Sequence, residues 1–296
     1  MGYLADRNEV ADSACTITSN VDWAETAPLT SLRTLPMIDA AESLALGTAA
    51  EPVQIDIVWD APIFLTYGGL HDTNLRQASY FRFDAWGDED RTDLLFTTTA
   101  ADGRDRRVVP GLTDPRYMRA GAPNQMRGDL EPRDFRLYPT HLHVAVPLCR
   151  PIAVRWTLWG SAYRADDSND TGYRIGLAWA GDGVGLQHVV GGSGEGVKSN
   201  DDKLVTPGGG VWVEPGVSRR SAQLSMPAVG KPVRDTLFDM SKRAGQNKPV
   251  VWLPNVDRPE ECFRYGGLFR RADDHEHKYV SSEYVGCTIT LEEWKE

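Results

Sequence analysis

The chain has 296 residues, 41% hydrophobic and 25% charged, a composition that fits a folded protein with a substantial core and excludes an intrinsically disordered chain. Its net charge of −10 argues against a protein that coats a nucleic-acid backbone, so we expect no nucleic-acid partner. The sequence has no run of eighteen apolar residues and no basic-then-apolar N-terminal signal, so we expect neither membrane insertion nor a secretion signal.

The cysteines predict reduced thiols. They lie far apart and form no C-x-x-C pair: Cys15, Cys149, Cys262 and Cys287. A zinc site would need closely spaced ligand pairs, which these cysteines do not supply. We therefore expect buried, reduced thiols in a protein made in the cytoplasm.

The first fifty residues mix Ala, Ser, Thr and Asp with scattered apolar residues and predict an extended N-terminal arm (residues 1–50). One short helix is expected around Ala40–Leu46. The apolar residues of the arm would anchor it to a neighbouring surface.

A β-sandwich is predicted over residues 51–172. An alternation of period two, typical of a half-buried strand, involves Val53, Ile55, Ile57 and Trp59. Further strands are expected within residues 78–88, 141–148, 152–163 and 173–181. The long stretch 97–135, rich in Gly, Pro, Asp and Arg, predicts a functional or interface-forming loop. Short strands between turn clusters, with no helical period among them, indicate antiparallel sheets.

The last third predicts a smaller β domain (residues 173–296) with one α-helix at about residues 232–244. Val233, Leu237 and Met240 recur at helical spacing, and Gly245 is placed to end the helix. The predicted fold class is therefore mainly β: an antiparallel sandwich followed by a small β domain with one helix.

A glycine-rich stretch, GGSGEGVKS at residues 191–199, is similar in spacing to a phosphate-binding loop. Val197 separates Gly196 from Lys198, which displaces the lysine from the position that reaches the phosphates. The following residues show no helical period, although a phosphate loop must open a helix. We predict a mobile loop between strands that takes part in a subunit interface.

Two histidine pairs could hold a metal, because His141 with His143, and His275 with His277, would each point to one face of a strand. The rest of a coordination shell is missing nearby, and solvent-facing or interface imidazoles explain both pairs. Clustered acids are typical of a solvated face, and DDSNDTG is similar to a calcium loop only in composition. No nucleophile or acid–base signature is present. We predict no catalytic residue, no cofactor and no metal.

One aromatic residue is a candidate for surface contact. Trp86 ends a predicted strand beside Gly87 and several acids, where it is a core residue, a partner contact or a glycan contact. His71 and Arg76 lie in the turn-like segment HDTNLR. Together these three residues are the candidate glycan or partner contacts.

A resemblance to known proteins comes from residues 137–183, LYPTHLHVAVPLCRPIAVRWTLWGSAYRADDSNDTGYRIGLAWAGDG. The aromatic-rich strand at Arg155–Trp159, the loop at Asp166–Tyr173 and the segment Ile175–Gly181 resemble tail-tip and baseplate proteins of long-tailed bacteriophages, of the distal-tail kind. The upstream stretch, IDIVWDAP to ASYFRFDAW, resembles their galactose-binding-like β-sandwich. The likeness covers roughly residues 15–296, and Leu177 departs from the usual Ile-Gly-Arg.

This resemblance implies a virion structural protein of the phage tail, made in the bacterial cytoplasm and without enzymatic activity. Such proteins form symmetric rings of identical subunits that link the tail tube to other tail proteins, including the hub and the tail fibre. The alternatives are a carbohydrate-binding module for host-surface glycans and a glycan hydrolase.

Overall fold

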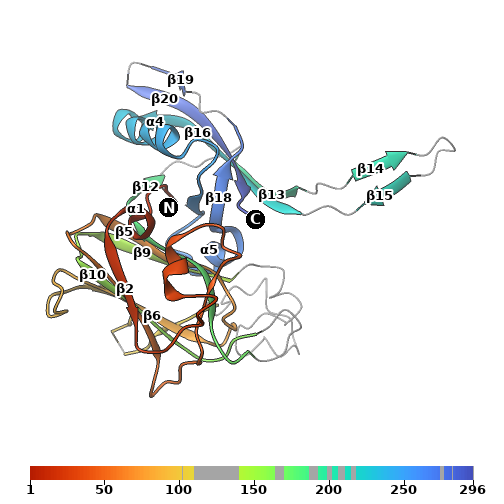
Figure 1. Cartoon of the computed structure of the whole chain (residues 1–296). Helices are drawn as coiled ribbons and strands as arrows, with labels where there is room; N and C mark the ends of the chain where they lie inside the picture. The colour runs from red at the N-terminus through yellow and green to blue at the C-terminus, as the bar shows by residue number, and fades with distance from the viewer. Residues whose placement is uncertain are drawn as a thin grey trace, which may run out of the picture. The chain divides into compact units, whose positions relative to one another are not determined.

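The computed structural model describes residues 1–101, 103–109, 140–163, 170–186, 193–198, 202–205, 211–214, 218–273, 277–281 and 283–295. Most of the predicted 97–135 loop, most of the DDSNDTG segment, His275 and the side chain of His277 lie outside the described residues. None of the helices within the described residues is long and apolar enough to cross a membrane. The chain is a mainly β protein with antiparallel sheets and few helices, as predicted (Figure 1).

Two compact units divide the chain. The sandwich unit contains residues 7–183 and 256–264, and the α4 unit contains residues 1–6, 184–255 and 265–295. The boundary therefore falls at Gly183 rather than at residue 172, and each unit is built from separate stretches of sequence. Stretches that are far apart in the chain can belong to one unit, because antiparallel pairing can join strands at any separation along the sequence.

The sandwich unit has two sheets. One follows the strand order β2 (Cys15–Ser19), β4 (Val53–Trp59), β10 (Ala153–Trp159), β6 (Tyr80–Trp86) and β7 (Leu94–Thr97), with β8 (Arg106–Arg107) also paired to β6. The other follows the order β3 (Ala41–Glu42), β11 (Arg174–Gly181), β5 (Leu65–Thr73) and β9 (Thr140–Cys149).

Aromatic side chains fill the space between these sheets. The ring of Trp156 lies 4.7 Å from that of Phe83, measured between centroids. A Cβ on Gly68 of the facing sheet would lie only 2.9 Å from the Phe83 ring, so the small residue lets the sheets approach closely. The alternation predicted in β4 is present, since Val53, Ile55, Ile57 and Trp59 are all at most 2% exposed.

The first fifty residues do not form a separate arm. β1 (Gly2–Ala5) pairs with β17 (Val250–Leu253) in the α4 unit, whereas α1 (Glu9–Asp12), the short 3-10 helix η1 (Leu29–Arg33) and β3 belong to the sandwich unit. Asn8 joins α1 to β11, because its side chain donates to the Ala178 carbonyl at 2.9 Å and caps the helix. The helix expected around Ala40–Leu46 is instead the strand β3, whose residues pair with β11.

The α4 unit contains an eight-stranded antiparallel sheet. Its path runs β12 (Gly183–Leu186), β1, β17, β18 (Gly267–Arg271), β20 (Tyr284–Glu293), β16 (Arg219–Gly230) and β13 (Gly194–Lys198), with β19 (His277–Tyr279) paired to β20.

The helix α4 (Lys231–Ala244) lies where the sequence predicts one. It buries Leu237, Met240 and Ala244 in the apolar core formed with β16 and β20. Gly245, with φ of +55°, ends the helix in a conformation that favours glycine. The last third also contains α5 (Pro259–Tyr265), which the sequence pattern missed because it is only 7 residues long.

The described part of the glycine-rich stretch, residues 193–198, contains a strand rather than a mobile loop. Gly194–Lys198 forms β13, which pairs with β16 in register from Gly194 opposite Gln223 to Lys198 opposite Arg219. After it, β14 (Asp202–Val205) and β15 (Val211–Glu214) pair into a two-stranded sheet of their own. The long neighbouring strand β16 supplies the backbone partners that sequence propensity does not reveal.

Candidate functional site

The three predicted contact residues do not form one surface. His71 is 0% exposed, so the prediction that it contacts a glycan or partner is wrong. Trp86 is 9% exposed, and the guanidinium groups of Arg91 and Arg155 lie 6.0 and 5.7 Å from its ring centroid. Trp86 is therefore a covered residue that carries cation–π contacts rather than an open stacking surface for a sugar. The Arg76 Nε donates to the Ala162 carbonyl at 3.3 Å, a contact that holds the chain after β5.

His71 belongs to a cluster that unites two strands. His141 and His143 lie on one face of β9, as predicted, with ring centroids 5.8 Å apart, and the His71 ring on β5 lies 5.2 and 5.6 Å from theirs. The Tyr67 hydroxyl lies 2.6 Å from His143 Nδ1 and 3.4 Å from His71 Nε2. The amide N–H of Asp72 donates to His141 Nδ1, which places the proton of a neutral His141 on Nε2.

His71 is the fully buried member of the histidine cluster. Burial, and then the neighbouring His143, hold the pKa of His71 well below its ordinary value. Among the described residues, no group of three or more His, Cys, Asp or Glu side chains is arranged to hold a metal ion. The cluster is therefore best described as part of the packing of the sandwich unit.

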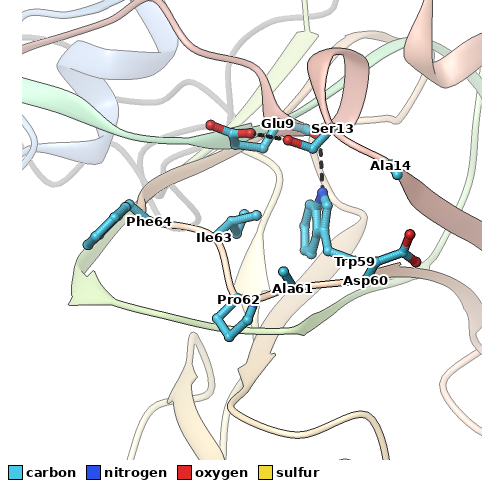
Figure 2. A pocket seen from close by; sticks show the side chains of 9 residues that line it. All are labelled: Glu9, Ser13, Ala14, Trp59, Asp60, Ala61, Pro62, Ile63 and Phe64. Carbon is cyan, nitrogen blue, oxygen red and sulfur yellow. Dashed lines mark hydrogen bonds between the residues drawn. The ribbon is translucent and has the colours of Figure 1, made fainter.

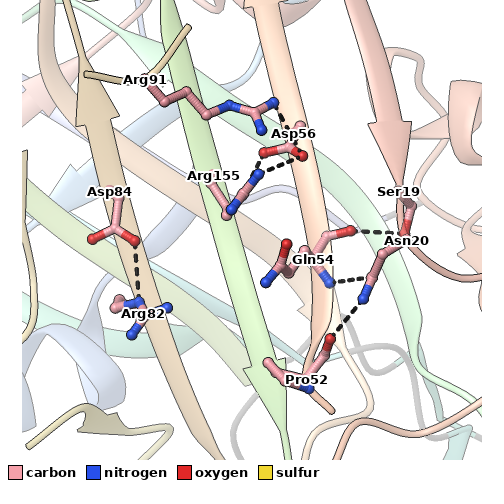
Figure 3. A network of polar contacts seen from close by, with 9 residues as sticks. All are labelled: Ser19, Asn20, Pro52, Gln54, Asp56, Arg82, Asp84, Arg91 and Arg155. Carbon is pink, nitrogen blue, oxygen red and sulfur yellow. Dashed lines mark hydrogen bonds and ion pairs between the residues drawn. The ribbon is translucent and has the colours of Figure 1, made fainter. Parts of the chain in front are cut away.

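A polar network covers the outer face of the other sheet (Figure 3). Arg155 on β10 donates to both carboxylate oxygens of Asp56 on β4, at 2.6 and 3.1 Å, and Arg91 lies 3.1 Å from the same carboxylate. Beside them, Arg82 lies 3.1 Å from Asp84. Burial raises the pKa of Asp84, although hydrogen bonding to Thr97 and the charge of Arg82 lower it in part. Each carboxylate in this network is paired with at least one arginine, so we interpret the network as a structural one.

A cavity of about 340 Å³ opens where α1 and β2 meet the turn between β4 and β5. The residues that line it are Glu9, Ser13, Ala14, Trp59, Asp60, Ala61, Pro62, Ile63 and Phe64. In Figure 2, Glu9 and Ser13 lie on one side of the Trp59 indole and Ala61 and Pro62 on the other. The register of β2 with β4, in which Cys15 is opposite Trp59, brings these two distant segments together.

Hydrogen bonds fix the walls of this cavity. The Trp59 indole N–H donates to the main-chain carbonyl of Glu9 at 3.0 Å, and the Ser13 hydroxyl donates to Glu9 Oε2. On the other side, the amide of Ile63 donates to the Pro151 carbonyl at 3.0 Å. The cavity is thus formed before any ligand arrives, which lowers the conformational cost of binding.

Carboxylates and apolar surface dominate the lining. Glu9 and Asp60 are its ionisable side chains, and Phe64 is 52% exposed. Two arginines lie close to the same segments: Arg150 has its guanidinium 5.0 Å from the Phe64 ring centroid, and Arg33 donates to the carbonyls of Val10, Ser13 and Cys15. The segments that line the cavity therefore carry two guanidinium groups beside them as well as the two carboxylates.

Sequence reasoning missed this site. The alternation along β4 correctly places Trp59 in the core, but it says nothing about the residues that pair with the strand end. The available signal was the segment Asp60–Phe64, where an aromatic residue and a proline follow a strand in a turn.

No protein-family model and no curated protein matches the chain. Among solved structures, it is similar to the lectin domain of lectinolysin complexed with Lewis B antigen, at 8% identity and a TM-score of 0.35, covering 59% of this chain and 96% of that one. The family 32 carbohydrate-binding module of Streptococcus pneumoniae EndoD matches at 11% identity and 0.35, over 59% and 98%. A fucose-binding module of the same organism matches at 7% and 0.34, over 59% and 94%.

Proposed function

We propose that the protein is a structural subunit of a symmetric assembly, and that this assembly is the tail tip or baseplate of a long-tailed bacteriophage. The observation that carries the assembly role is the position of β13 at the end of the eight-stranded sheet path. An edge strand offers backbone N–H and C=O groups to a strand of another chain. The tail context rests on the sequence resemblance at Arg155–Gly181 and would place the protein in the virion, beside tube, hub and fibre proteins.

The edge strand is held in place and open to solvent. All residues of β13 are exposed, with Val197 at 70%. The Lys198 ammonium lies 2.6 Å from Glu292 Oε1 on β20, which keeps the strand end in register. A fixed, exposed edge is suited to strand addition because little order has to be created on binding.

The hairpin of β14 and β15 is the second assembly element. A two-stranded hairpin by itself is marginally stable in water and gains stability by joining further strands or packing on a surface. When each identical copy contributes the same edge and the same hairpin, repeated contacts close into a ring. The proposal therefore needs only one kind of contact per subunit.

Light scattering and electron microscopy of the full chain test this proposal. We expect the mass to rise with concentration toward one closed oligomer that is visible as a ring. Val197→Lys, which places a charge on the edge strand, should shift the protein toward monomer. Val280→Lys is the matched control, because Val280 is a similarly exposed valine (63%) on the same unit but not on β13. The proposal is wrong if the protein stays monomeric at every concentration and is absent from tail particles.

Saccharide recognition by the sandwich unit is a second function, compatible with the first. The cavity beside Trp59 favours it, because it combines carboxylates, a hydroxyl and an exposed aromatic ring, the groups that contact sugar hydroxyls and ring faces. A glycan array probed with the full chain, followed by titration at millimolar sugar, tests it. Failure of every sugar to bind at that concentration removes this function and leaves the assembly role intact.

A further inference from the structure

We propose that the cavity at Glu9, Ser13, Asp60, Pro62 and Phe64 is the saccharide site and that it takes one neutral sugar ring, an assignment that rests on the saccharide recognition proposed above. Phe64, which is 52% exposed although Arg150 lies over its ring, and Pro62 supply the apolar contact for a ring face. Glu9 and Asp60 accept hydrogen bonds from hydroxyl groups. Ser13 is a positioning residue that holds the Glu9 carboxylate.

The size of the cavity limits the ligand. At about 340 Å³ it lies near the lower end of the range of small-molecule pockets, about 300–1,000 Å³. It therefore suits a single terminal sugar ring rather than a long internal stretch of polysaccharide. Its walls come from a helix, a strand end and a turn, and the Trp59–Glu9 hydrogen bond joins the first two.

The charges select a neutral ligand. A uronic or sialic acid would bring a carboxylate against Glu9 and Asp60, and like charges at close range disfavour binding. An ammonium ligand would meet the guanidinium groups of Arg33 and Arg150, which lie against Ser13 and Phe64 of the lining and repel a positive charge. Arg150 stacks on Phe64 and the three nitrogens of Arg33 donate to main-chain carbonyls, so both guanidinium groups are engaged.

Ser13 acts through Glu9. Its hydroxyl donates to Glu9 Oε2 and holds the Glu9 carboxylate in place. A carboxylate already oriented for hydroxyl groups loses less side-chain entropy when the sugar binds. Removal of the Ser13 hydroxyl should therefore weaken binding without removing any group that contacts the sugar.

Ligand-observed NMR and calorimetry on the full chain test the assignment. The probes are the neutral methyl glycosides of glucose, galactose, mannose, fucose and N-acetylglucosamine, with glucuronate, galacturonate and glucosamine for comparison. We expect at least one neutral glycoside to bind, and the acidic sugars to bind about tenfold more weakly or not at all. Equal affinity for a neutral sugar and its uronate, or tighter binding of glucosamine, would overturn the proposed selectivity.

Substitutions of the residues that line the cavity test whether the sugar binds there. Phe64→Ala and Asp60→Asn change exposed side chains and should each raise the Kd of the neutral sugar about tenfold. Glu9→Gln should do the same, and Ser13→Ala should raise it by a smaller factor. Phe238→Ala is the control, since Phe238 is a similarly exposed phenylalanine (46%) that lines a separate cavity in the α4 unit. Thermal unfolding shows whether each variant is folded.

The outcomes separate this assignment from the function on which it rests. If a neutral sugar binds and Phe64→Ala and Asp60→Asn leave its Kd unchanged, the site lies elsewhere, and the assignment is wrong although saccharide recognition stands. If no sugar binds to the folded wild-type chain, saccharide recognition itself fails, and the assignment fails with it.

Discussion

The hydroxyl of Tyr67 lies 2.6 Å from Nδ1 of His143, across the pairing of β5 with β9. Tyr67 is 0% exposed, and the same hydroxyl lies 3.4 Å from His71 Nε2. The tyrosine therefore connects two of the three histidines of the cluster. Breaking this contact costs free energy, because the polar group left behind has lost its partner and has no water to replace it.

Tyr67→Phe tests the strength of this connection. We expect the free energy of unfolding to fall by about 1–3 kcal/mol, since the His143 ring nitrogen loses its partner in a partly buried place. Urea unfolding followed by tryptophan fluorescence measures the change. Tyr80→Phe is the control, because Tyr80 is 37% exposed and lies on the outer face of the other sheet. Equal stability of Tyr67→Phe and wild type would show that the hydroxyl contributes nothing.

The histidine cluster predicts a loss of stability in mild acid. Burial lowers the pKa of His71 in the folded protein, so the unfolded chain binds this proton more readily, with an ordinary pKa near 6.5. The contribution of His71 is complete above about pH 6.5 and is lost as the pH falls from there toward its folded pKa. The slope from one proton is at most about 1.4 kcal/mol per pH unit. Urea midpoints of wild type and His71→Gln between pH 4 and 8 measure it, and an identical slope in both would contradict the prediction.

A buried ion pair anchors β16 to β20 in the α4 unit. Arg220 Nε donates to Glu293 Oε1 at 2.7 Å, its main-chain N–H donates to Oε2 at 3.0 Å, and Glu293 is 3% exposed. Burial opposes the charge on Glu293, but Arg220 and Lys295 outweigh it and the pKa of this carboxyl is lowered.

Arg220→Met should destabilise the protein by about 3–5 kcal/mol, because it leaves the Glu293 charge buried without its main partner. The double variant Arg220→Met with Glu293→Gln should recover part of this loss, since the uncompensated charge is gone. Denaturant unfolding of wild type, of the two single variants Arg220→Met and Glu293→Gln, and of the double variant completes a double-mutant cycle. Additive effects, with no coupling between the two positions, would contradict the prediction.

Two glycines offer a matched test of packing. A Cβ on Gly172 would lie 1.8 Å from the Ser43 carbonyl oxygen, whereas a Cβ on Gly194 would meet nothing within 4 Å. Gly172→Ala should therefore destabilise the sandwich unit by about 1–3 kcal/mol or more, because it displaces β3 from β11. Gly194→Ala should change stability by less than about 0.5 kcal/mol. Thermal unfolding of both variants decides whether the segment around Ser43 is packed as described.

Local patterns in the sequence were enough for individual elements. The period-two alternation from Val53 to Trp59 corresponds to β4, and the helical spacing of Leu237 and Met240 corresponds to α4. These signals are local because the side-chain period follows directly from backbone geometry. The same patterns also indicated the fold class and placed His141 and His143 on one strand face.

The sequence by itself determined the mainly β character of this protein, its helix at about residues 232–244 and the core face of its central strands. Only the tertiary structure decided that β1 pairs with β17, that the glycines at 194–196 lie in an edge strand, and that Glu9 and Asp60 line one cavity. The physical reason is that a strand completes its hydrogen bonds on a partner that its own residues do not specify. Pairing, not local pattern, brings distant side chains into one site.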